Sequence, residues 1–299
     1  METFPQPLRS GLQSIPQNSG MLDTRLCKAI TETPGMSPER LMIKLLPIAR
    51  LYARVPISNF RVGAVVKARL SKDSDEFALF LGANSEFAGQ DLTQTIHAEQ
   101  AAVVNAWQQG AVQIDAIAVS AAPCGRCRQF LYELDTRHSL TIIVPQPDRD
   151  SYTNERLPDL LPQAFGPKDL SAAGLTLSGE DPPTLSLKMS FDDPLVLKAL
   201  SAAERTYAPY THNFAGCTIQ INHQKIYTGS YLESVAFNPS LSPLHTAIIQ
   251  MNMDDFVTGG TITRAILVEK PTTISQRGVS ELLLDALAPE IHLAYYEVC

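Results

Sequence analysis

The apolar residues of the chain fall into short blocks with two different spacings. Blocks that alternate with polar residues, or are apolar throughout, and that polar turns bound predict β-strands. In the first half of the chain they span 60–70, 77–87, 114–122 and 140–146. Apolar residues at helical spacing predict helices over 38–56, 95–107 and 123–134. Strands that alternate with helices are typical of an α/β fold, in which helices cover the faces of a sheet.

A similar order of elements returns after residue 190. We predict a helix over 194–209 and strands over 216–222, 225–234, 265–269 and 291–298. Pro56, Ser58 and Gly63 recur 153 residues later as Pro209, Thr211 and Gly216. Gly82 and Glu86 recur 147 residues later as Gly229 and Glu233. A charged insert of six residues at 71–76, in the first copy, accounts for the difference between the separations of 153 and 147 residues. Five matches can arise by chance, but the parallel order of elements favours a duplication.

The duplication divides the chain into four parts. Residues 1–37 form an extension that we expect to be partly disordered, because its start is rich in Pro, Gln and Ser. Residues 38–170 form the first copy and 191–299 the second. Residues 171–190, rich in Pro, Gly and Ser, are the expected linker.

Candidate metal ligands gather in the first copy. His97 begins one predicted helix, and Cys124 and Cys127 lie three residues apart at the start of the next, where the helix dipole stabilises thiolates. Both helices should begin at the same sheet edge, so the three side chains can converge on zinc. Three protein ligands leave a fourth position for water, as in catalytic zinc sites. A closed site with His138 as the fourth ligand is the weaker alternative, because His138 lies at the far end of its helix.

Glu99 follows His97 by two residues. On an ideal helix these positions point to nearly opposite sides, which speaks against Glu99 as a ligand. In the first turn its carboxylate can still reach back beside the water and move a proton, which is worth ~10²–10⁴ in rate. The alternative role is a carboxylate stabilised by the helix N-terminus. The separation of 147 places Leu244 and Thr246 opposite His97 and Glu99, so we expect no zinc in the second copy.

"HAEQ" at 97–100 together with "PCGRCRQ" at 123–129 resembles the zinc-dependent cytidine deaminase family, in its longer two-domain type. The resemblance covers roughly residues 38–299. It implies a three-layer α/β/α fold, duplicated into a catalytic N-terminal copy and a metal-free C-terminal copy. It also implies one Zn²⁺ per chain, a homodimer, and Glu99 as the proton shuttle. The implied reaction is hydrolytic deamination of cytidine and deoxycytidine to uridine and deoxyuridine with release of ammonia, a step of pyrimidine salvage.

The resemblance implies substrate contacts as well. Asn84 and Glu86 would hydrogen-bond the ribose 3′-hydroxyl, and Phe60 would pack on the pyrimidine. The amide of Ala98 and the carbonyl of Ala122 would face the pyrimidine ring and its amine.

Two further aromatic residues would wall the pocket. Phe165 would close it from a neighbouring domain or subunit, and Phe237 belongs to the second copy, whose domains complete neighbouring pockets in the family. Arg128 and Gln129 are candidate partners of the thiolates, with a surface ion pair as an equal alternative for Arg128.

Charge and composition limit the partners. The net charge of -7 argues against a nucleic-acid partner, since phosphate binding requires a basic face. No apolar run approaches the roughly 18 residues of a membrane span. The five cysteines suggest no disulfide framework, so we expect a cytoplasmic protein. A small nucleoside is the expected substrate, because Glu86 would repel a 3′-phosphate. The alternatives are a polynucleotide cytidine deaminase and a zinc-containing scaffold without activity.

Overall fold

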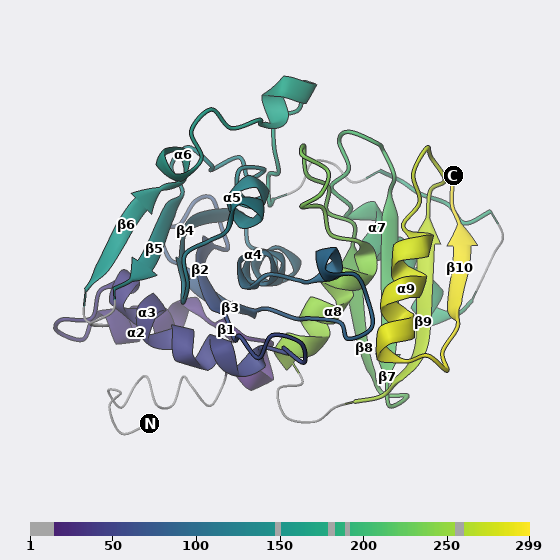
Figure 1. Ribbon diagram of the computed structural model, residues 1–299, viewed down its shortest axis with the longest axis horizontal. Coiled ribbons are helices and arrows are strands. Elements are labelled where there is room, and N and C mark those ends of the chain that lie inside the picture. Colours follow the sequence, from purple (N-terminus) through teal and green to yellow (C-terminus); the bar gives the residue numbers. More distant parts are fainter. Residues whose placement is uncertain (1–14, 147–150, 179–182, 189–191, 255–259) are drawn as a thin grey trace.

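The computed structural model describes residues 15–146, 151–178, 183–188, 192–254 and 260–299. Its strands form two separate mixed sheets, which lie at opposite sides of the molecule with helices between them (Figure 1). The first sheet has the order β1-β3-β2-β4-β5-β6 and the second the order β10-β9-β7-β8. Pairing is parallel between β4 and β5 and between β9 and β10, and antiparallel between the other neighbours.

The strands of the first sheet are β1 (Met21–Leu22), β2 (Gly63–Arg69), β3 (Ala78–Ala83), β4 (Gln113–Val119), β5 (Thr141–Pro145) and β6 (Tyr152–Arg156). The helices around it are α2 (Thr24–Thr31), α3 (Pro38–Ala49), α4 (Ala98–Gln108), α5 (Gly125–Leu131) and α6 (Leu157–Leu160). The second half contains α7 (Pro194–Glu204), β7 (Ala215–Ile221), β8 (Lys225–Ser230), α8 (Pro243–Asp254), β9 (Ile262–Glu269), α9 (Arg277–Leu287) and β10 (Leu293–Glu297). The predicted strands and helices are all present, and the helix expected over 38–56 ends at Ala49 in a short 3₁₀ turn.

Alternation along the strands explains why helices cover both faces of each sheet. In the first sheet Val65 and Leu81 are buried against α2 and α3, whereas Val66 and Phe80 are buried on the α4 side. In the second sheet Ile266 and Val268 pack with α7 on one face. Ala265 and Leu267 pack with α8 and α9 on the other face. Each copy is therefore a three-layer α/β/α unit, as predicted.

The two copies repeat the same loop anchor. The Oε2 atom of Glu86 accepts hydrogen bonds from the amides of residues 57–58 at 2.8 and 3.0 Å. The Oε2 atom of Glu233 accepts equivalent bonds from the amides of residues 210–211 at 2.9 and 3.2 Å. The same carboxylate therefore holds the same loop in both copies, which agrees with a duplication.

The helix register of the second copy differs from the prediction by two residues. A Cβ atom at Gly82 would lie 2.1 Å from the amide nitrogen of Ala102, and one at Gly229 would lie 2.3 Å from that of Ala247. These two glycines allow α4 and α8 to pack directly on their sheets. Ala102 and Ala247 are 145 residues apart, not 147.

The cause is a shorter loop before α8. Ser85 pairs with Ile96 in the first copy and Leu232 with Leu241 in the second, so the second loop has two residues fewer. The residue opposite His97 is consequently Ser242, and Leu244 stands opposite Glu99. The expected pairing of Leu244 with His97 and of Thr246 with Glu99 was wrong. Neither Ser242 nor Leu244 can replace the first copy's residues, so the absence of zinc from the second copy stays a prediction.

Part of the N-terminal extension is built into the first copy. Ile15, Leu22, Cys27 and Ile30 are fully buried, and β1 pairs with β3 as the edge strand of the sheet. Residues 1–14, where disorder was expected, lie outside the described part. The described part of the expected linker also makes contacts, because Leu187 forms a β-bridge with Val298 beside β10.

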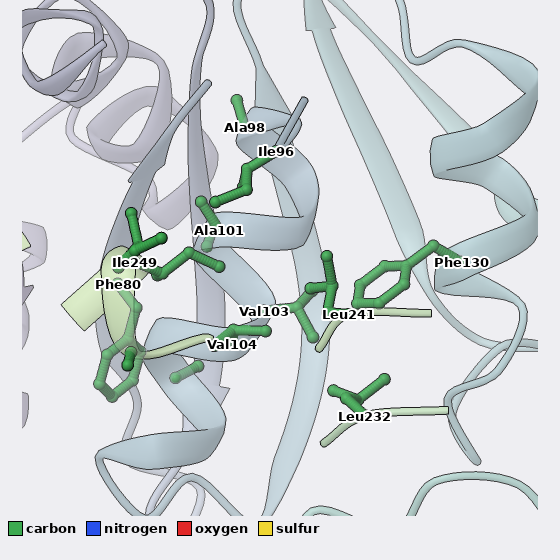
Figure 2. Packing of buried hydrophobic residues seen from close by; sticks show 14 of the residues in the cluster. Phe80, Ile96, Ala98, Ala101, Val103, Val104, Phe130, Leu232, Leu241 and Ile249 are labelled. Atoms are coloured by element: carbon green, nitrogen blue, oxygen red, sulfur yellow. The ribbon is translucent and has the colours of Figure 1, made fainter. Parts of the chain in front are cut away.

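The two copies share one hydrophobic core. Helix α4 packs against α8, and the cluster around it draws apolar residues from both halves (Figure 2). In Figure 2, Val103 and Val104 of α4 lie near Leu232, Leu241 and Ile249 of the second copy. Helix α4, which begins at the candidate zinc ligand His97, is therefore buried by the other half of the chain. Within the described residues, no helix has both the length and the apolar character needed to cross a lipid bilayer.

Candidate active site

His97, Cys124 and Cys127 meet at the starts of two helices. His97 is the N-cap residue of α4, and Cys124 is the N-cap of α5 with Cys127 in its first turn. The Nδ1 atom of His97 lies 3.7 Å from Cys124 Sγ and 3.3 Å from Cys127 Sγ, and the two sulfurs lie 3.5 Å apart. Among the described residues this is the group of three whose ligand atoms come close enough to share a metal ion.

These separations fit zinc. A tetrahedral Zn²⁺ with Zn–S and Zn–N bonds of ordinary length holds two sulfurs about 3.8 Å apart, and a sulfur and a nitrogen about 3.6 Å apart. Two thiolates and one imidazole are also the donors that zinc prefers. The three groups predicted from sequence are therefore arranged as zinc ligands. His138 takes no part in this group.

The start of α5 favours the thiolate form of Cys124. The hydrogen bond with Cys127 is the main factor that lowers the pKa of Cys124 to about 5, and backbone amides of α5 contribute. The pKa of Cys127 is raised, because it shares that hydrogen bond and is buried. Burial lowers the pKa of His97, so its imidazole is neutral, as a metal ligand must be.

Glu99 is a buried carboxyl beside this group. Its exposed fraction is 4%, and burial raises its pKa from 4.5 to about 7. Its side chain also hydrogen-bonds with Cys127. Because His97 is an extended N-cap residue, the ideal-helix separation of positions two apart does not apply, and Glu99 lies on the same side as the ligands. A carboxyl with a pKa near neutrality can both accept and return a proton at physiological pH.

Comparison with known proteins agrees with this site. Residues 36–142 and 157–281 each match a family model described as the cytidine and deoxycytidylate deaminase zinc-binding region. The chain is 37% identical over 300 residues to a cytidine deaminase of Aliivibrio fischeri, covering 99% of this chain and 95% of that protein. It is 40% identical over 271 residues to a cytidine deaminase of Photorhabdus laumondii, covering 89% and 86%. The chain belongs to the cytidine deaminase family. A crystal structure of cytidine deaminase from Burkholderia pseudomallei aligns with 44% of this chain and 100% of that one, at 31% identity and a TM-score of 0.36.

Asn84 and Glu86 of this family member hold the loop at 56–62. Asn84 Oδ1 accepts from the Val62 amide at 2.8 Å, and its Nδ2 donates to the Phe60 carbonyl at 2.9 Å. The Oε1 atom of Glu86 accepts a hydrogen bond from the Ser58 hydroxyl. Hydrogen bonds from Ser58 and the Ile57 amide lower the pKa of Glu86 despite some burial, so this carboxylate is ionised.

The remaining predicted contacts differ in exposure. Ala98 is buried at the start of α4, and Ala122 is exposed just before the cysteine helix. Phe60, Phe165 and Phe237 are 62%, 47% and 61% exposed. Three large apolar rings that face solvent in one chain are available to a substrate or a neighbouring chain.

Phe165 lies beside the cysteine helix of its own domain. Gln129 Nε2 donates to the Phe165 carbonyl at 2.8 Å. Arg128 donates to the carbonyls of Pro123 and Leu160, both at 2.9 Å. Gln129 and Arg128 thus fix the backbone on either side of the site. The sequence suggested the thiolates as their partners, with a surface ion pair as an equal alternative for Arg128.

Two residues at the site were given no role from the sequence. Arg126 Nη1 donates to the Thr93 carbonyl at 2.7 Å, and its guanidinium interacts electrostatically with Cys127 and Cys124. His245 comes from the second copy and lies 3.0 Å from the Gln94 carbonyl. The spacing of Arg126 within "PCGRC" places it near the cysteines, but its contact with the loop before α4 depends on the fold.

Proposed function

We propose that this cytidine deaminase family member hydrolyses cytidine and deoxycytidine to uridine and deoxyuridine, releasing ammonia, as a step of pyrimidine salvage. The observation that carries the proposal is the buried Glu99 carboxyl beside a His–Cys–Cys group with zinc spacing. The relatives named cytidine deaminase, which match almost the whole chain, support the choice of base.

Each group of the site has a chemical task in this reaction. His97, Cys124 and Cys127 would hold the zinc, which when bound acidifies a water ligand at neutral pH. Glu99 takes a proton from the attacking water and delivers it to the leaving amine. Its raised pKa suits both transfers, because neither form of the carboxyl is strongly favoured near pH 7.

Asn84 and Glu86 can serve the ribose while they hold their loop. An ionised carboxylate has about four acceptor positions, and a carboxamide nitrogen has two hydrogens. Each side chain therefore retains capacity for the 3′-hydroxyl. Phe60 is proposed to pack on the pyrimidine, with the Ala98 amide and the Ala122 carbonyl at its polar edge.

We also propose a cytoplasmic homodimer that acts on free nucleosides. The exposed rings of Phe165 and Phe237 support it, since each offers a large apolar surface to a partner chain. Phe237 would reach a pocket of the partner chain. All five cysteines are free, which agrees with a reducing compartment.

An ammonia-release assay tests the function. Cytidine, deoxycytidine, adenosine and a single-stranded oligonucleotide are compared, each with and without a chelator. Turnover of both cytidines and its loss with chelator are expected. Faster turnover of the oligonucleotide would favour a polynucleotide deaminase, and no turnover of any substrate by zinc-loaded protein would favour a scaffold.

A further inference from the structure

The start of α4 is held by a side chain that reaches both ways. Gln100 Oε1 accepts from the amide of His97 at 3.1 Å, which completes the cap of the helix. Gln100 Nε2 donates to the carbonyl of Pro239 at 3.0 Å, in the second copy. Gln100 is fully buried. One side chain therefore links the zinc ligand's backbone to the other half of the chain.

His245 forms the corresponding link from the second copy to the first. Its Nδ1 atom lies 3.3 Å from the amide of Ser242 and 2.8 Å from the Ser242 hydroxyl, and it caps the start of α8. Its Nε2 atom lies 3.0 Å from the carbonyl of Gln94, in the first copy. The Ser242 amide and the Gln94 carbonyl together require Nδ1 to accept and Nε2 to donate. The ring also packs edge-on against Phe87, with centroids 6.0 Å apart.

The two links are reciprocal. The separation of 145 residues that relates α4 to α8 also relates Gln100 to His245 and Gln94 to Pro239. Each copy thus uses the third residue after its cap to hold the loop that precedes the other copy's helix. Only the link from His245 ends on a loop that leads to a metal ligand.

That loop is attached to other elements on both sides of Gln94. Gln94 ends a short 3₁₀ helix, Leu92–Gln94, three residues before His97. Arg126 holds the carbonyl of Thr93, and Ile96 bridges to Ser85. Gln94 lies between these two attachments, and His245 supplies the hydrogen bond to its carbonyl.

We propose that His245 is a positioning residue for the first copy, and that the second copy uses it to fix the loop that leads to His97 and Glu99 at the start of α4. The hydrogen bond from Nε2 sets where the backbone enters α4. A loop free to shift would place His97 Nδ1 and the Glu99 carboxyl less accurately against the cysteines of α5. The inference deepens the proposed function at the same site.

Three substitutions at one position test it. His245→Gln keeps an acceptor and a donor in the arrangement that Gln100 already shows, His245→Ala removes both, and His245→Phe keeps the ring's volume without either. Val196→Ala, a truncation in α7 on the far face of the second sheet, controls for loss of stability alone. The measurements are the rate at which a chelator removes zinc, and kcat and KM for cytidine.

His245→Ala and His245→Phe should release zinc about 10-fold faster than the wild type and lower kcat by a similar factor with KM nearly unchanged. His245→Gln should stay within about threefold of the wild type in both measurements. If His245→Ala does not fold, His245→Phe decides. Zinc release and kcat in His245→Phe equal to those of Val196→Ala would overturn the proposal. Zinc release needs no substrate, so this result stays distinct from a failure of the proposed cytidine reaction.

Discussion

Replacing Glu133 should lower the free energy of unfolding more than replacing any exposed residue does, because Glu133 joins the two copies. Glu133 lies two residues after the end of the cysteine helix α5 and is 1% exposed. Its Oε1 accepts from the hydroxyls of Tyr207 and Tyr210 at 2.7 and 2.6 Å, and its Oε2 accepts from the amide of Val235 at 2.8 Å. All three donors belong to the second copy, so one carboxylate ties two of its loops to the catalytic copy.

The magnitude follows from those three donors. Glu133→Ala leaves one buried amide and two half-buried hydroxyls without their acceptor, at about 1–3 kcal/mol for each group when fully buried. Partial entry of water reduces the sum, so we expect a loss of about 3–5 kcal/mol in the free energy of unfolding. Glu133→Gln should cost only about 1 kcal/mol, because its amide can accept from Val235 and donate to a tyrosine oxygen.

Thermal unfolding of zinc-loaded protein, followed by the fluorescence of Trp107, measures the difference. Trp107 is the single tryptophan and lies near the end of α4, so it reports on the region between the copies. Glu290→Ala, at an exposed turn, is the control and should change stability by no more than about 0.5 kcal/mol. If Glu133→Ala stayed within 1 kcal/mol of the wild type, the three hydrogen bonds would not be a major link.

Four further outcomes are expected. Glu99→Gln should abolish turnover with zinc retained, and Cys124→Ala should lose the metal; atomic absorption and ammonia release separate the two. Cytidine 3′-monophosphate should have a kcat/KM at least about 100-fold below that of cytidine, because its charge would meet a carboxylate; equal values would refute the ribose contacts. Phe237→Ala should raise KM about 10-fold or more without changing zinc content. Burial lowers the pKa of His245 to about 4, with a minor contribution from Arg126, so the folded protein binds fewer protons there than the unfolded one. Its share of stability is complete above about pH 6.5 and falls as the pH drops towards 4, by about 2 kcal/mol at pH 5; His245→Gln should show a flatter stability profile on acidification.

The metal site could be predicted because its signal is local. His97, Cys124 and Cys127 lie at helix starts, and helix starts after strands of one sheet meet at one edge. Residue type, spacing and a coarse α/β order were therefore enough to bring the ligands together. Glu99 could be predicted by the same reasoning. It faces the metal ligands because the cap residue His97 is extended and does not follow ideal helix geometry.

The contacts between the copies could not be predicted in the same way. His245, Glu133 and Gln100 stand in segments that look like ordinary helix and loop, and their partners are 74 to 151 residues away. The register of α8 was missed for a related reason, since a loop two residues shorter leaves the strand anchors unchanged. The pairing of β1 with β3 was missed because a strand of two residues gives no periodicity.

In the second copy, hydrogen bonds between polar side chains hold the start of α9. Gln276 occupies the N-cap of α9, as Cys124 does in α5. The fully buried Glu269 lies beside it and accepts from the Gln276 amide at 2.6 Å, from Asn213 Nδ2 at 3.0 Å and from the Ser275 hydroxyl at 2.7 Å. A buried carboxylate is tolerated where such donors surround it. These hydrogen bonds hold this end of the second copy together.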